Sequence, residues 1–153
     1  MGKANFSAEE WPVVAKLPLH AAAFVVASAP HSGIGTARDM LAAAAELVNR
    51  HGGESGNLLV SDAASDTPAS GDPGPTKHSD ENLERLRAAI TSAVALVDAK
   101  AGADGPGYKT AAYRVAEVAA RTSGDGFLSI GGEKVNDDER AALAWVHEAL
   151  GLA

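Results

Sequence analysis

Apolar residues in this chain recur at the spacing of a helix rather than of a strand. Over residues 83–100, apolar side chains return every three or four positions. This spacing places them on one face of an α-helix, whereas a half-buried strand alternates apolar and polar residues. Aromatic residues make up only 5% of the chain. Because strands favour β-branched and aromatic residues, the chain is predicted to be all-α.

Capping residues predict where the first helix begins. Ser7 and Glu10 have the spacing of a capping box, in which each side chain bonds to the backbone amide of the other residue. Phe6 and Trp11 have the spacing of a hydrophobic staple across the same turn. Pro12 follows at once, so this first helix is predicted to be short or kinked.

The remaining helices follow from the same signals. Residues 18–28 are apolar on every side, which predicts a central, buried helix. Gly102 to Gly107 are predicted to separate two helices, and Gly151 to stop the last one. The chain of 153 residues is therefore expected to be one domain, a bundle of five or six helices. The further helices are predicted at residues 37–49, 83–100, 108–121 and 137–150.

Residues 52–79 differ in composition from the rest of the chain. They are rich in Gly, Pro and Ser, and they offer almost no apolar side chain to bury. Such a segment cannot offset the entropy lost on ordering, so a long mobile loop is expected here. The apolar island at residues 57–60 is the one part that could dock on the bundle.

Composition excludes several classes of function. The chain has no Cys, which rules out disulfides, thiolate chemistry and Cys-ligated zinc. Its net charge is −7 with no basic stripe, so nucleic-acid binding is not expected. The longest apolar run, residues 21–27, is too short to span a membrane, and no secretory signal is recognisable. The expected location is therefore cytoplasmic.

A resemblance to known proteins is carried by residues 6–11, 17–19, 96–100, 126–135, 138–143 and 150–152. Through these segments the chain resembles a family of small, all-helical bacterial proteins that are frequent in actinobacteria and have no assigned function. The resemblance covers most of the chain outside the loop. It implies a helical fold and nothing about activity.

The last part of the chain, from Gly132 to Leu152, is more distantly similar to TerB-like domains, which are linked to tellurite resistance and stress response. Those domains bind a divalent cation through acidic turns between helices. The resemblance implies Asp125, Glu133 and Asp138 as metal ligands. The alternative is that these acids cap a helix and interact with its dipole, without any cofactor.

Four further side chains are candidates for binding a small molecule. His20 and Phe24 lie in the apolar segment 18–28, and Trp145 and His147 lie on the last helix. They could line a pocket between Ala-rich helices. The alternative is that each is a core residue that fills a seam between helices. Trp145 also forms a stripe with Ala141, Glu148 and Leu152 that could face a partner.

These observations favour a non-enzymatic module, acting in stress response or assembly, that binds a partner protein or a second copy through an apolar helix face. No nucleophile motif or diagnostic Ser/His/Asp set is present. Two alternatives stay open. One is a small helical enzyme or ligand-binding protein, and the other is a TerB-like domain that binds a divalent cation.

Overall fold

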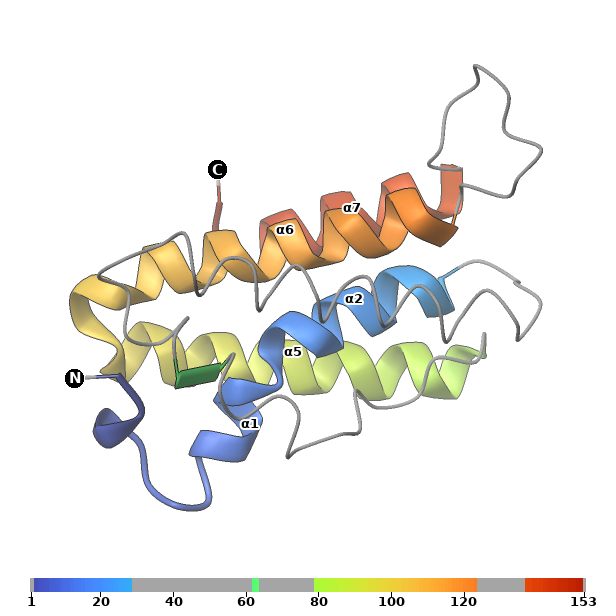
Figure 1. The fold of residues 1–153 in the computed structure, drawn as a ribbon. Coiled ribbons are helices and arrows are strands. Elements are labelled where there is room, and N and C mark those ends of the chain that lie inside the picture. Colours follow the sequence, from blue (N-terminus) through green and yellow to red (C-terminus); the bar gives the residue numbers. More distant parts are fainter. Residues whose placement is uncertain (1, 29–61, 64–78, 124–136, 153) are drawn as a thin grey trace.

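The computed structural model describes residues 2–28, 62–63, 79–123 and 137–152, and within them the chain is mostly helical (Figure 1). No strand occurs in these ranges, which confirms the predicted all-α class. The α-helices are α1 (Trp11–Ala15), α2 (Leu17–Ala27), α5 (Asp80–Lys100), α6 (Gly105–Ser123) and α7 (Asp137–Ala149). Two short 3-10 helices are η1 (Gly2–Asn5) and η2 (Gly102–Asp104).

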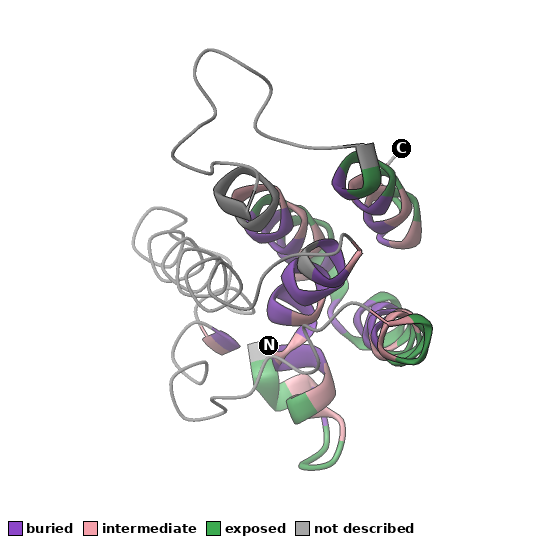
Figure 2. Ribbon diagram, turned by 90° about the vertical axis from the view of Figure 1, so that its right-hand side faces the viewer, coloured by how far each residue is buried: buried purple, intermediate pink, exposed green. Residues whose placement is uncertain are grey.

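Helix α2 lies at the centre, as its apolar sequence predicts. It packs against α1, α5, α6 and α7, and its most extensive contact is with α6. Residues 21–25 are all buried, so every side of the helix is covered. Figure 2 shows the buried α2 with the other helices arranged around it. Small Ala side chains on α2 and α6 allow these two helices to approach closely.

The predicted capping box forms. The Ser7 amide donates to Glu10 Oε2 over 2.9 Å, and the Glu10 amide donates to Ser7 Oγ over 3.1 Å. The Phe6 and Trp11 rings pack with centroids 6.0 Å apart, as the staple predicts. Regular α-helix begins only at Trp11, after a turn, and α1 has 5 residues, in agreement with the prediction that Pro12 shortens it.

Helix α5 begins three residues earlier than the apolar pattern predicts. The Asn82 amide donates to Ser79 Oγ over 3.1 Å, so Ser79 is the N-cap. Asp80 and Glu81 then form the first turn, where the helix dipole favours acidic side chains. The buried stripe of α5 is the predicted one, and it contains Leu86, Ile90, Ala93, Val94 and Val97.

The predicted break at residues 102–107 is shorter than expected. Gly102 adopts a positive φ of 59° directly after Ala101, the C-cap of α5, and α6 already starts at Gly105. Pro106 does not oppose this early start, because the first turn of a helix needs no bond from its nitrogen. Tyr108 is fully buried, and its hydroxyl donates to the Val14 carbonyl over 2.5 Å. Burial raises the pKa of this phenol, so it stays a hydrogen-bond donor.

Helix α7 ends at the predicted glycine. Gly151 has a φ of 72°, its amide donates to the Glu148 carbonyl over 3.0 Å, and the Leu152 amide donates to the His147 carbonyl over 3.1 Å. These two bonds define a Schellman motif, which satisfies carbonyls that the helix end leaves open. Only a residue that tolerates positive φ forms it without strain.

Replacing Gly151 by Ala is therefore expected to lower the free energy of unfolding by about 1–2 kcal/mol, the cost of a left-handed conformation for an L-residue. Urea denaturation followed by far-UV circular dichroism measures this change. The matched control is Gly107→Ala, because Gly107 is exposed inside α6 and its φ is not positive. Ala there is expected to raise stability by about 0.5–1 kcal/mol. Equal effects at the two sites would contradict this account of Gly151.

Most of the predicted loop at residues 52–79 and the whole predicted helix at 37–49 lie outside the described residues. Within the loop, Asp62 and Ala63 are helical. Asp62 Oδ2 accepts a 2.8 Å hydrogen bond from the Lys3 amide, and Ala63 is buried in the core. These two residues therefore differ from the expected mobile loop, because they contact the rest of the fold.

Candidate functional site

Helices α2 and α7 bring together two of the predicted site residues, Phe24 and Trp145. Their ring centroids are 4.8 Å apart, and the ring planes are tilted by 44°. Phe24 is buried, with 2% of its surface exposed, whereas Trp145 is half-buried. The geometry is that of a favourable aromatic pair, in which an inner ring supports an outer one. Trp145 is thus held in place and still reaches the surface.

Arg87 of α5 completes this cluster. Its guanidinium carbon lies 5.3 Å from the centroid of the Phe24 ring and 5.8 Å from that of Trp145. Both distances are within the range of a cation–π interaction. Arg87 Nη1 also forms a 2.6 Å ion pair with Glu84 Oε1 on the same helix. We call Phe24, Arg87 and Trp145 the aromatic cluster.

Sequence reasoning missed Arg87, although a signal for it exists. Arg87 lies four residues after Leu83 and three before Ile90, so it shares the edge of the apolar stripe of α5. A long cationic side chain at such an edge can cover apolar surface with its stem and keep its charge near solvent. The spacing does not reveal which aromatic rings of other helices lie next to Arg87.

His147, by contrast, faces a different neighbour. Its ring packs edge-on against Tyr113 of α6, with centroids 5.1 Å apart and an interplanar angle of 75°. Residues two positions apart on a helix lie on nearly opposite sides, so Trp145 and His147 lie on different faces of α7. His20 is half-buried on α2, one turn before Phe24. The structure therefore joins Phe24 and Trp145 directly and places His147 elsewhere.

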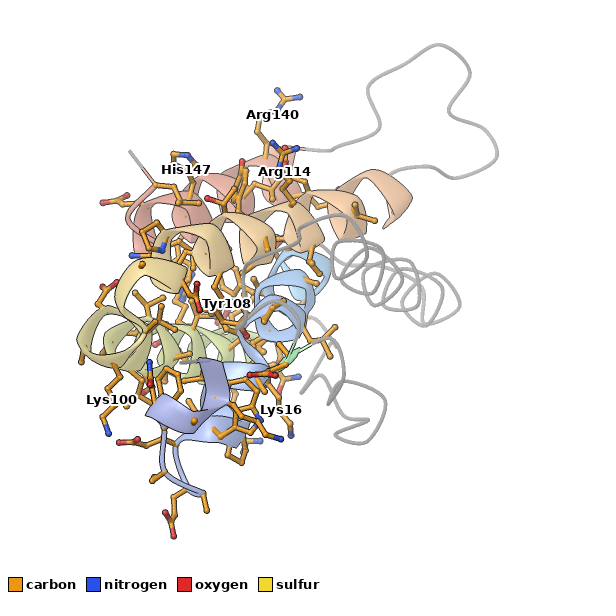
Figure 3. The ribbon with its side chains drawn as sticks, turned by 60° about the vertical axis from the view of Figure 1, so that its left-hand side comes forward. Lys16, Lys100, Tyr108, Arg114, Arg140 and His147 are labelled. Carbon is orange, nitrogen blue, oxygen red and sulfur yellow. The ribbon has the colours of Figure 1, made fainter. Side chains whose placement is uncertain are left out.

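The two sides of α7 also differ in polarity. Arg114 and Arg140 are exposed, and Figure 3 shows them on the same side of the α6–α7 pair as His147. The Trp145 side instead presents the stripe formed by Ala141, Trp145, Glu148 and Leu152. In this stripe Ala141 and Glu148 are exposed, and Trp145 and Leu152 are half-buried. We call these four residues the Trp145 stripe.

Of the three predicted metal ligands, the structure describes only Asp138, because Asp125 and Glu133 lie outside the described residues. Asp138 is exposed in the first turn of α7, and its carbonyl accepts a 3.4 Å hydrogen bond from Ser28 Oγ. Its neighbour Glu139 is fully buried in the same turn, where the helix dipole favours a carboxylate. Across the described ranges, no three His, Asp or Glu side chains lie close enough to hold a metal ion.

In the part of the chain that the structure describes, no helix combines the length and the apolar character that crossing a bilayer requires.

Comparison with known proteins adds no relative. No family model matches the chain. No curated protein and no solved structure is similar to it at a significant level. The resemblances to the small bacterial helical family and to TerB-like domains therefore stay expectations from the sequence.

Proposed function

We propose that this chain is a non-enzymatic helical interaction module that binds a partner protein through the Trp145 stripe of α7. The observation that carries the proposal is the position of Trp145. Trp145 is half-buried, and Phe24 and Arg87 support its ring from α2 and α5. Tryptophan is the residue type most typical of interface hot spots.

The surroundings of Trp145 support a protein partner. A ring that already packs on two neighbours loses little conformational freedom on binding, which reduces the entropy cost of association. Ala141 is exposed one turn before Trp145 on α7, and its small side chain lets a partner approach the indole closely. Glu148 adds a polar edge to the stripe, as in many interface rims.

The ligand-binding alternative receives less support from the same cluster. The Arg87 guanidinium already lies over both rings. An apolar ligand that inserted between Phe24 and Trp145 would have to displace this cation and lose its interaction with the rings. The cation-binding alternative depends on Asp125 and Glu133, and no observation among the described residues favours it.

A photo-crosslinking residue at position 141 tests the proposal in cells of the source organism. We expect a defined crosslinked product, and mass spectrometry then shows whether the partner is a second copy or another protein. The matched control places the same residue at Ala95, which is equally exposed but lies on α5. Crosslinking at both positions alike would contradict a specific role for the stripe.

Truncating Trp145 is expected to weaken the interaction strongly. The loss of a hot-spot tryptophan costs about 2 kcal/mol or more, so Trp145→Ala should reduce the yield of the position-141 product about tenfold or more. Trp145→Phe keeps an aromatic ring on Phe24 and should restore part of the yield. A thermal melt of each variant verifies that the fold persists. An unchanged yield in a folded Trp145→Ala variant would refute the proposal.

A further inference from the structure

The segment before α1 contacts both Asp62 and the end of α5. We call residues 2–9 the N-terminal strap. The Lys3 amide donates to Asp62 Oδ2 over 2.8 Å, and Asn5 Nδ2 donates to the Lys100 carbonyl at the end of α5 over 2.9 Å. From residue 3 to residue 9, Phe6 is the one buried side chain. A segment with so little buried apolar surface can open without unfolding the whole domain.

Glu10 connects this strap both to α1 and to α5. Its Oε1 accepts a 2.8 Å hydrogen bond from Lys100 Nζ, and its Oε2 accepts a second one of 2.7 Å. Oε2 also accepts the 2.9 Å bond from the Ser7 amide in the capping box. The Glu10 carboxylate thus closes the turn at the end of the strap and joins this turn to Lys100, the last residue of α5. Figure 3 shows Lys100 beside the N-terminal segment.

We propose that the N-terminal strap is an acid-sensitive latch, in which protonation of Glu10 releases residues 2–9 from the end of α5 while the helices stay folded. Release would separate Phe6 from Trp11 and expose aromatic surface that the closed strap covers. The remaining helices keep their own core, and the buried bond from Tyr108 to Val14 continues to hold α1.

The electrostatic environment of Glu10 agrees with release of the strap at low pH. The pKa of Glu10 is lowered, first by the hydrogen bond from Lys100 and then by the one from the Ser7 amide, while desolvation opposes them. A carboxyl group with a lowered folded-state pKa stabilises the closed form fully above its ordinary pKa of 4.5. That stabilisation is lost as the pH falls through the lower folded-state pKa.

Other titratable and charged groups lie on the strap and on the elements near it, and they need control. Asp62 holds the Lys3 amide. Helix α5 contributes Lys100, together with Asp98, which is paired with Lys109 over 2.6 Å. Asp104 lies on η2 and His20 on α2, the helix that follows α1. Glu9, the last residue of the strap, is exposed next to Glu10, and it provides a matched exposed carboxylate.

The two tryptophans allow a direct test in the full chain. In a Trp145→Phe background, Trp11 is the single indole, and its emission reports the loss of the Phe6 contact. On acidification we expect the emission to change with a midpoint below 4.5, while far-UV circular dichroism keeps its helical signal at that pH. Coincident transitions by both probes would mean global unfolding and would overturn the proposal.

Substitutions identify the titrating group. Glu10→Gln is neutral, as protonated Glu10 is, so its strap should already be released at neutral pH and its Trp11 emission should show no acid transition. Lys100→Met removes the cation that lowers the pKa of Glu10, and the midpoint should move to higher pH. Glu9→Gln and Asp62→Asn should leave the transition in place. A transition that survives in Glu10→Gln, or that Asp62→Asn abolishes, would refute Glu10 as the latch.

Discussion

Ile90→Ala is expected to lower the free energy of unfolding by about 2–5 kcal/mol, the range for truncating a large aliphatic side chain in a packed core. Ile90 is fully buried in the middle of the apolar stripe of α5. Ile90 belongs to the hydrophobic core, so the lost side-chain atoms leave a cavity there. Natural domains have about 5–15 kcal/mol of stability in total, so this loss is a large share.

Urea denaturation followed by circular dichroism measures the effect. Ile90→Val removes a single methylene and is expected to cost about 0.5–1.5 kcal/mol. Thr91→Ala, one residue further on the exposed face of α5, should change stability by less than about 0.5 kcal/mol. If Ile90→Ala were as mild as Thr91→Ala, the packing of α5 on α2 described above would be wrong.

Ala112→Leu is expected to destabilise the fold by about 1–3 kcal/mol, because it adds volume to a packed core instead of leaving a cavity. Ala112 is fully buried on α6, the helix with the most extensive contact to α2. Helix α2 carries three small side chains, Ala21, Ala22 and Ala23, which are also fully buried. A larger side chain at this seam would push the two helices apart or force strained rotamers, because protein interiors contain little free space.

The matched control for this prediction is Ala95→Leu on the exposed face of α5. Leu has nearly the helix propensity of Ala, so this change should alter stability by less than about 0.5 kcal/mol. The pair therefore separates overpacking from propensity. A neutral Ala112→Leu variant would show that the seam between α2 and α6 holds space for a larger side chain, which favours the ligand-binding alternative.

The aromatic cluster illustrates what a periodic pattern leaves open. Phe24 and Trp145 were both candidates from the sequence, yet they lie on helices far apart along the chain. The pattern identifies each as part of a helix, and it does not say that the two rings meet at 4.8 Å or that Arg87 joins them. His147 shows the same limit, because it packs on Tyr113 of α6 rather than with the other three candidates.

The sequence by itself determined the helical class, the turn before α1 and the end of α7, because these depend on neighbours only a few residues away. Ser7 with Glu10, and Gly151, act within one or two turns of a helix. The tertiary structure alone decided which helix covers each apolar face. The physical reason is that burial stabilises any apolar partner of suitable shape, so periodicity marks a face for burial without specifying the helix that packs on it.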